Sequence, residues 1–294
     1  MGDRSALFPP EFLERLTTLH LAAGRAAGGG RPADRTAPRV GSGTDFADHR
    51  EYMAGDDPRQ IDWRLYGRSG RFFTKLYHAE EDRTVTIALD CSASMGAEPG
   101  KFEFARRLAA ALSFVTLSDR DALALCPFRE GLHEPLPDIR GRASFPRVMD
   151  RLSDLEPGGR TDLTAVAREL AARSRRQGLL LVISDFMDGP QPGLGLSATC
   201  GPAVEAGAIQ VHTVTEREPE ARGFFRLQDV ETGATRALTL DRRLARRFTE
   251  TFDAYCEELS SRCRALGIRY LRLCTETSIE EAVLKRLRTA GLAA

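Results

Sequence analysis

Several features that define common classes of protein are missing from this sequence. Its 42 basic and 42 acidic side chains balance, so the formal net charge is zero. A chain without excess positive charge has no overall basic field for nucleic acid, and we expect no nucleic-acid partner. The sequence also has no G-x-x-x-x-G-K-[ST] phosphate loop and no G-x-S-x-G nucleophile elbow. These absences argue against a P-loop nucleotide-binding protein and against a serine hydrolase of the elbow type.

Long apolar runs are missing as well. The longest, Leu108–Leu117 and Leu179–Ile183, are too short to cross a bilayer, which takes about 18 residues. The N-terminus carries charged residues and lacks the apolar stretch of a signal peptide. The six cysteines are scattered and form no C-x-x-C pair, which suits reduced thiols better than a zinc site. We therefore expect a cytoplasmic protein without a membrane segment.

The periodicity of apolar residues divides the chain into three regions. Residues 1–40 read as an amphipathic helix over Glu11–Ala23 followed by a Gly-, Pro- and Arg-rich linker. Residues 41–80 form a polar-aromatic segment that we expect to pack on the core. In residues 81–294 strands alternate with helices, which is typical of a mostly parallel sheet with helices on both faces. The sequence thus predicts a three-layer α/β domain of the Rossmann type with an N-terminal extension.

Within the third region, individual elements can be predicted from alternation, capping residues and turn residues. We expect strands at Thr84–Leu89, Ala122–Phe128, Leu179–Ser184, Ala208–Val214 and Ile268–Cys274, a helix end at Gly201–Ala206, a hairpin joining Leu227–Val230 to Arg236–Leu240, and a long helix over Asp241–Leu266. In parallel sheets, binding sites form at the carboxyl ends of the strands. The loops that follow these strands are therefore the places to search for function.

One such loop carries a cluster of oxygen ligands. Asp90 follows the strand at Thr84–Leu89 directly, and Ser92 and Ser94 come next at a spacing of two. Alternate residues of an extended segment point the same way, so these three side chains can converge. A carboxylate with two hydroxyls suits Mg²⁺ or Mn²⁺ and does not suit zinc. An aspartate that merely caps a helix, with nothing bound, is the alternative.

Two further loops could complete this cluster. Thr161 lies in a glycine-rich turn before a helix, and Asp185 follows the strand at Leu179–Ser184. Asp162 fits a helix cap better than a ligand. Because Mg²⁺ takes about six oxygens, two carboxylates and three hydroxyls with water leave room for one outside ligand. An acidic side chain of a partner protein would fill that vacancy and balance the charge.

The three loops together resemble the metal-ion-dependent adhesion site of von Willebrand factor A domains. The matching segments are Asp90-Cys91-Ser92-Ala93-Ser94, Gly159-Arg160-Thr161 and Ser184-Asp185. The resemblance implies a von Willebrand factor A-like fold and a bound divalent cation, Mg²⁺ first. It implies that Ser92, Ser94 and Thr161 approach the metal through their hydroxyls, and that Asp90 and Asp185 act directly or through water. It also implies capture of an acidic side chain of a partner.

A longer resemblance, to the domain of unknown function 58 family, covers most of the chain. It is carried by Gly43-Thr44-Asp45-Phe46, by the segment from Arg50 to Arg68, by the Asp90 loop and by Leu227-Gln228-Asp229-Val230-Glu231-Thr232-Gly233. Members are often encoded beside MoxR-type AAA+ ATPases, so the resemblance implies such an ATPase, or its client, as the partner. One branch of the family carries membrane segments, which we do not expect here.

The segment from Arg50 to Arg68 is dense in charged and aromatic residues and has two interpretations. Its notable members are Arg50, Tyr52, Asp56, Asp57, Arg59, Asp62, Trp63 and Arg68. The favoured interpretation is a buried or half-buried ion-pair network that joins the N-terminal segment to the domain, with Trp63 as its apolar anchor. The other is a docking surface, because tryptophan, tyrosine and arginine are the residues enriched at interface hot spots.

The sequence therefore favours a metal-dependent protein-interaction module over an enzyme. Ser92 and Ser94 have no evident histidine partner for nucleophilic catalysis. A metal-dependent hydrolase or phosphatase is the alternative, since an aspartate at a strand end can accept a phosphoryl group. Phosphatases of the haloacid dehalogenase type, however, carry a second aspartate two residues later, where this chain has Ser92.

Overall fold

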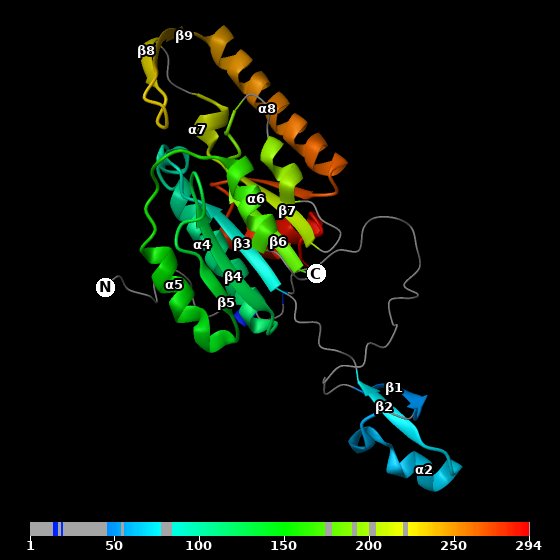
Figure 1. The fold of residues 1–294 in the computed structure, drawn as a ribbon. Coiled ribbons are helices and arrows are strands. Elements are labelled where there is room, and N and C mark those ends of the chain that lie inside the picture. Colours follow the sequence, from blue (N-terminus) through cyan, green and yellow to red (C-terminus); the bar gives the residue numbers. More distant parts are fainter. Residues whose placement is uncertain are drawn as a thin grey trace. The chain divides into compact units, whose positions relative to one another are not determined.

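The computed structural model describes residues 14–16, 19, 46–53, 56–77, 84–173, 178–189, 193–199, 204–219 and 223–293 (Figure 1). The chain divides into two compact units. The larger comprises residues 1–26 and 83–294, and the smaller comprises residues 27–82.

A mixed sheet forms the centre of the larger unit. Its strands are β3 (Thr84–Asp90), β4 (Ala122–Phe128), β5 (Leu136–Ile139), β6 (Gly178–Ser184), β7 (Val204–His212) and β10 (Arg269–Cys274). They lie in the order β10-β7-β6-β3-β4-β5, and only the edge strand β5 runs antiparallel to its neighbour. The α/β fold with a mostly parallel sheet that the sequence predicts is confirmed.

Helices cover both faces of this sheet, as a buried parallel sheet requires. The longer ones are α4 (Lys101–Ser118), α5 (Phe145–Ser153), α6 (Leu163–Arg173) and α8 (Arg242–Ala265). Side chains of β3 alternate between two cores: Ile87 packs in the cluster that contains Leu108 of α4, and Ala88 in the cluster that contains Val166 of α6 and Leu259 of α8. The sheet is thus the middle layer of three (Figure 1).

Short elements complete the larger unit. They are α3 (Ala93–Gly96), η2 (Arg142–Ser144), η3 (Leu194–Thr199), α7 (Val214–Arg217), α9 (Ile279–Glu281), the π-helical turn η4 (Ala282–Arg286) and α10 (Leu287–Thr289), with the two-stranded hairpin β8 (Gly223–Gln228) and β9 (Thr235–Leu240). The hairpin and the long helix α8 are confirmed. The carboxylate of Asp241 caps α8 by accepting from the Leu244 N–H at 2.7 Å.

One expected element is wrong. Residues 204–206, within the predicted helix end at Gly201–Ala206, begin strand β7, and residues 201–203 lie outside the described residues. Close packing within the sheet accounts for the small residue at Gly207, directly after the predicted helix end. A Cβ at Gly207 would meet the side chains of Leu292 at 2.6 Å and Leu181 at 2.9 Å. The strand therefore needs a glycine there for space rather than for a turn.

The start of the chain contributes to the core of the larger unit. Residues 14–16 are helical, and Leu16 and Leu19 are fully buried in the cluster that contains α4. Arg15 Nη1 forms an ion pair with Glu280 Oε2 at 2.9 Å. The rest of the predicted Glu11–Ala23 helix and the linker after it lie outside the described residues.

The smaller unit is built on an antiparallel pair of strands. Its elements are β1 (Phe46–Glu51), η1 (Pro58–Gln60), α2 (Trp63–Ser69) and β2 (Phe73–Tyr77). Asp62 caps α2, because its Oδ1 accepts from the N–H groups of Arg64 and Leu65. Gly70, at φ 67°, ends the helix in the left-handed region.

In the described part of the chain, no helix combines the length and the apolar composition that crossing a membrane requires.

The packing of the N-terminal segment can be tested with neighbouring substitutions. We expect Leu16→Ala to lower the free energy of unfolding by about 2–5 kcal/mol, because it leaves a cavity in the core. Arg15→Ala alters an exposed side chain whose ion pair with Glu280 lies at the surface, and it should change stability little. Urea unfolding followed by circular dichroism measures both. Equal, small effects would show that the segment does not pack on the core in solution.

Candidate functional site

The order of the strands brings two acidic loops together. The chain leaves β3 for β4 on one side and later returns to β6 on the other side. This reversal is a topological switch point, where sites form in α/β proteins. Leu89 of β3 pairs in register with Ile183 of β6. Asp90 and Asp185, which follow these two residues closely, therefore lie at the same edge of the sheet.

All five predicted metal ligands meet at this edge: Asp90, Ser92, Ser94, Thr161 and Asp185. Asp90 Oδ1 accepts from the Ser92 N–H at 2.9 Å and lies 3.5 Å from the Thr161 hydroxyl. The hydroxyls of Ser92 and Ser94 are 3.0 Å apart. Asp90, Ser92 and Asp185 are buried, whereas Ser94 and Thr161 are half-buried. Three loops that are distant in sequence thus supply one group of oxygen atoms.

Backbone bonds fix the glycine-rich turn against the Asp90 loop. The Gly158 N–H donates to the Cys91 carbonyl at 2.8 Å, and the Ala93 N–H donates to the Gly159 carbonyl at 2.9 Å. Gly159 has a φ of 77°, which a residue with a side chain rarely adopts. The positive φ accounts for the glycine at position 159, and the two backbone bonds hold the turn, and with it Thr161, beside the Asp90 loop.

The alternative that this loop only caps a helix does not describe its geometry. Ser92 occupies the cap position of α3, but in this described loop its side chain makes no capping bond and pairs with Ser94 instead. The expected cap at Asp162 is present, since its Oδ1 accepts from the Ala165 N–H at 2.8 Å. Cys91 points into the core, and burial, followed by the charge of Asp90, raises the pKa of its thiol to about 12. Its thiol is therefore not a reactive group.

Ser184 is a member of the site that the sequence reasoning missed. Its hydroxyl donates to Asp90 Oδ2 at 2.7 Å and accepts from the Phe186 N–H at 2.9 Å. Asp185 is held in turn: its Oδ1 accepts from the Met187 N–H at 3.1 Å, and its carbonyl accepts from Gln210 Nε2 at 3.0 Å. Both carboxylates therefore have fixed orientations.

Lys101 is the second missed member, and it supplies the positive charge. Its side chain is fully buried, and Nζ lies 2.7 Å from Asp185 Oδ2, 2.5 Å from Glu216 Oε1 and 3.2 Å from the Ser94 carbonyl. Burial lowers the pKa of this ammonium, but the two carboxylates outweigh it and the pKa ends above its ordinary value. A lysine in the first turn of a helix lies at the positive end of the helix dipole, which is unfavourable. This unusual position is the feature of the sequence that could have pointed to Lys101.

Acidic groups outnumber this ammonium at the edge of the sheet. Burial and the nearby Asp185 raise the pKa of Asp90. Burial also raises the pKa of Asp188 to about 6, with Asp185 and Glu231 among the contributing charges. Glu231, from the turn between β8 and β9, contacts Thr161. Neighbouring carboxylates raise one another's pKa, and a cation bound between them would offset that repulsion.

The donor atoms present are of the kind that a hard divalent cation takes, although the described residues contain no group of three or more acidic, histidine or cysteine side chains arranged around a metal. The donors are carboxylate and hydroxyl oxygens, they come from three rigidly joined loops, and they carry excess negative charge after Lys101 is counted. Mg²⁺ and Mn²⁺ take such oxygen donors. Metal binding by these residues stays a prediction, and the convergence of the donors is what the structure adds to it.

The charged segment from Arg50 to Arg68 forms local networks within the smaller unit. Asp56 Oδ1 accepts from Arg50 Nη2 at 2.7 Å, and its Oδ2 accepts from the Met53 N–H at 3.0 Å. Tyr52 donates to the Asp56 carbonyl at 3.2 Å. Asp62 receives bonds from α2 and from His49, and these hold the pKa of its carboxyl down at about 2. These bonds all lie within the smaller unit, and the predicted role of joining this segment to the rest of the domain stays a prediction.

The aromatic residues of the same segment do not form a buried anchor in the smaller unit. The Trp63 side chain is 61% exposed, and it packs edge-on against Tyr66 and Phe72, which are also exposed. Arg59 and Arg68 are exposed as well, and Asp57 only caps η1 through the Arg59 N–H at 2.9 Å. Tryptophan was expected inside because it is large and apolar; here it lies on the first turn of a short helix with one solvent face.

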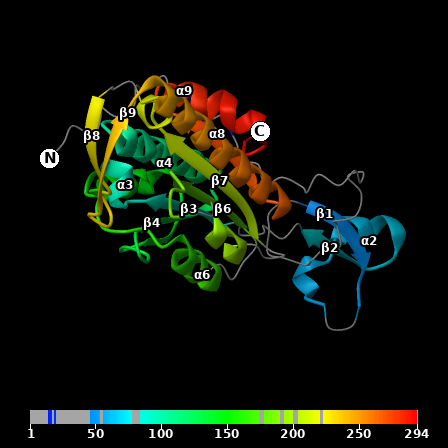
Figure 2. The ribbon, with the colours of Figure 1, turned by 90° about the horizontal axis from the view of Figure 1, so that it is seen from above.

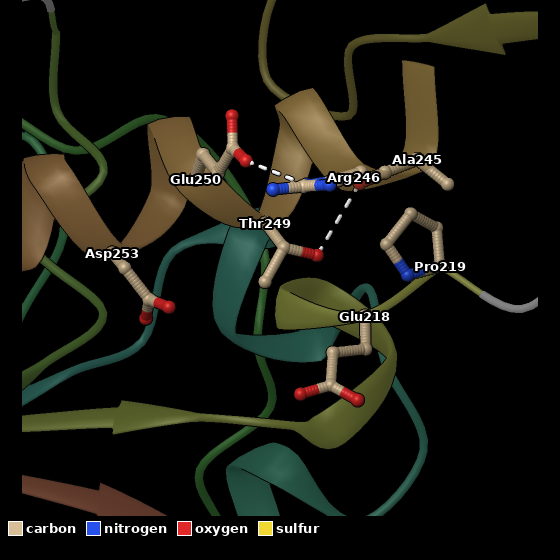
Figure 3. A pocket seen from close by; sticks show the side chains of 7 residues that line it. All are labelled: Glu218, Pro219, Ala245, Arg246, Thr249, Glu250 and Asp253. Carbon is tan, nitrogen blue, oxygen red and sulfur yellow. Dashed lines mark hydrogen bonds and ion pairs between the residues drawn. The ribbon is translucent and has the colours of Figure 1, made fainter. Parts of the chain in front are cut away.

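A pocket of about 450 Å³ lies between the end of α7 and helix α8, and none of the five predicted metal ligands lines it (Figure 3). Its lining residues are Glu218, Pro219, Ala245, Arg246, Thr249, Glu250 and Asp253. Its charged groups are already paired: Arg246 Nε contacts Glu250 Oε1 at 2.9 Å, and Asp253 accepts from Arg217 and Arg272. Paired charges of this kind give the pocket no chemistry comparable to that of the three loops.

The fold and the three loops define an α/β domain whose carboxyl edge presents an Asp-x-Ser-x-Ser cluster. The chain belongs to the family described as "Protein of unknown function DUF58", whose model matches residues 48–257. This match confirms the family that the sequence motifs suggested.

The chain is also similar to curated proteins and to solved structures. The chain is 25% identical over 286 residues to the uncharacterized protein Rv1480 of Mycobacterium tuberculosis, covering 93% of this chain and 88% of that protein. Similar solved structures include the conserved hypothetical protein BatB from Bacteroides thetaiotaomicron, with 19% identity, a TM-score of 0.44 and coverage of 71% of this chain and 98% of that one. Another is a von Willebrand factor type A protein from Catenulispora acidiphila, with 12% identity, a TM-score of 0.43 and coverage of 74% and 43%. At these identities the structural likeness concerns the fold alone.

The role of the buried ammonium can be tested by removing it. We expect Lys101→Met to lower the free energy of unfolding by about 3–5 kcal/mol, because it leaves buried carboxylates without their cation. Lys285→Met replaces an exposed lysine and is the matched control. Thermal and urea unfolding of both variants, with metal removed by chelation, measure the difference. Equal stabilities would mean that Lys101 does not compensate the acidic loops.

Proposed function

We propose that this chain is a metal-dependent protein-interaction module. Mg²⁺, or Mn²⁺ in its place, would be held by Asp90, Ser92, Ser94, Thr161 and Asp185. The observation that carries the proposal is the convergence of these oxygen-bearing side chains, from three separate loops, at the carboxyl edge of the sheet. One coordination position remains for an acidic side chain of a partner protein. The metal supplies a positive charge for that side chain to bind.

Binding accounts for the geometry better than catalysis does. The hydroxyls of Ser92 and Ser94 face each other, and the described residues around them offer no histidine within hydrogen-bond distance to act as a base. Asp90 is engaged on both oxygens, by the Ser92 N–H and the Ser184 hydroxyl, so it is poorly placed to attack a phosphoryl group. We therefore propose that the protein is not an enzyme.

The partner we propose is a MoxR-type AAA+ ATPase or a client of that ATPase, in the cytoplasm. Its support is the family resemblance, together with a site that has room for an acidic side chain. In this scheme the chain is an adaptor: the metal site binds one protein, and other surfaces remain available to bind a second one. The exposed cluster of Trp63, Tyr66 and Phe72 offers such a second surface.

Metal binding is the first test. We expect isothermal titration of Mg²⁺ into the metal-stripped full chain to show saturable binding at one site. Asp90→Asn should abolish it, and Thr161→Val should weaken it by about tenfold or more. Thr251→Val removes an equivalent hydroxyl from the exposed face of α8 and is the matched control. Circular dichroism confirms that each variant is folded.

A different result would overturn the proposal. Absence of saturable heat with either Mg²⁺ or Mn²⁺ would show that the loops hold no metal unaided. Unchanged affinity in both Asp90→Asn and Thr161→Val would place any bound metal elsewhere in the chain.

Capture of the partner is the second test. We expect the purified chain to retain a purified MoxR-type AAA+ ATPase from the same genome when Mg²⁺ is present and to lose it when a chelator is added. Thr161→Val should reduce retention, whereas Thr251→Val should not. Retention that neither the chelator nor Thr161→Val affects would mean that any interaction with the ATPase uses another surface.

A further inference from the structure

The turn of the β8–β9 hairpin, residues 229–234, reaches the loops of the proposed metal site. Glu231 Oε2 accepts from the Thr161 N–H at 3.3 Å, and Glu231 Oε1 lies 3.4 Å from the Thr161 hydroxyl. Figure 2 shows the hairpin beside α3, at the end of the sheet where that site lies. An acidic side chain of this same chain thus already stands at the site.

The Thr161 hydroxyl lies between two carboxylates. It is 3.4 Å from Glu231 Oε1 and 3.5 Å from Asp90 Oδ1. A hydroxyl has one hydrogen to donate, and both distances are long for an O–H···O bond. Hydrogen bonding to Thr161 alone therefore leaves the two carboxylates poorly compensated. A cation bound to the lone pairs of the hydroxyl would lie next to both carboxylates and would compensate the negative charge of both.

The turn is built to present Glu231. Asp229 Oδ1 accepts from the N–H groups of Glu231 at 2.9 Å and Thr232 at 2.8 Å, and the Gly233 N–H donates to the Asp229 carbonyl at 2.8 Å. These backbone bonds, with a smaller contribution from Arg160, hold the pKa of Asp229 below its usual value. The Glu231 backbone is fixed before its side chain meets the site.

The rest of the hairpin is weakly anchored. Its strands pair with each other in a separate two-stranded sheet, and most of their side chains are exposed, including Phe224 and Leu227. A two-stranded hairpin without a core is marginally stable by itself. The contacts of Glu231 with Thr161 therefore help to set where the turn lies, and little buried surface opposes its displacement.

We propose that Glu231 is an internal ligand of the metal site, in the position that an acidic side chain of the partner would otherwise take. The inference rests on the proposed function, because it assumes the same metal. It adds that the site is occupied from within, so the partner binds by displacing the turn of the hairpin. This gives a role to the segment Leu227–Gly233, which the metal loops alone leave unexplained.

The test compares Glu231→Gln, which keeps the shape and removes the charge, with Glu250→Gln on the exposed face of α8. We expect Glu231→Gln to weaken Mg²⁺ binding by about tenfold in isothermal titration. With Mn²⁺ bound, the Glu231→Gln variant should relax water protons faster than the unmodified chain does, because a water molecule takes the place of the carboxylate on the metal. Hydrogen exchange of residues 223–240 should slow on addition of Mg²⁺ in the unmodified chain and not in Glu231→Gln. Glu250→Gln should match the unmodified chain throughout.

The outcomes separate this inference from the function on which it rests. If the unmodified chain binds no Mg²⁺, both fall together. If it binds Mg²⁺ and Glu231→Gln changes neither the affinity nor the relaxation, the metal site stands and Glu231 is no ligand. An affinity that rises in Glu231→Gln would overturn the inference as well, since it would mean that the carboxylate opposes the metal.

Discussion

The buried ammonium of Lys101 is the interaction on which this edge of the sheet depends. It joins the Ser94 carbonyl, at the start of α3, to Asp185 after β6 and to Glu216 of α7. The segments that it links are far apart in the sequence, and two of them would otherwise place negative charge in a buried region. A buried charge is tolerated only when it is paired and hydrogen-bonded. The orientation of the Asp185 carboxylate, and through it the shape of the proposed site, follows from this pairing.

The main elements and the metal loops were predictable because they follow local rules. An apolar strand that ends in Asp90, with serines at a spacing of two, carries its own geometry. Asp185 could be added because parallel strands end at a common edge, and Thr161 because it lies in a glycine-rich turn directly before a helix. The failure at Gly201–Ala206 has an equally local cause: small residues that suggest a helix end also allow close packing in a strand, and only the neighbours of Gly207 decide between the two.

The residues that complete the site could not be found in this way. Lys101 meets Asp185 across 84 residues, Ser184 meets Asp90 across 94, and Glu231 meets Thr161 across 70. Each pair depends on the order of strands or on where a hairpin lies, which periodicity does not specify. Lys101 left a trace as a cation in the first turn of a helix, and Ser184 and Glu231 stand in the segments that carry the family resemblances. Trp63 shows that the residue type alone does not predict burial, because a large apolar side chain can lie on either face of a short helix.

The balance of charge connects the proposed metal to the proposed internal ligand. Lys101 contacts Asp185 and Glu216, so its single charge is already shared between two carboxylates. Asp90 and Glu231 remain, one on each side of the Thr161 hydroxyl. A hydroxyl can orient a carboxylate but cannot neutralise two. A divalent cation would carry the charge that these two lack, and its preference for oxygen would match the groups around it. A site that bound only an acidic side chain of a partner would need no carboxylate of this chain at that position. Glu231 lies there, and we therefore treat the hairpin as part of the site.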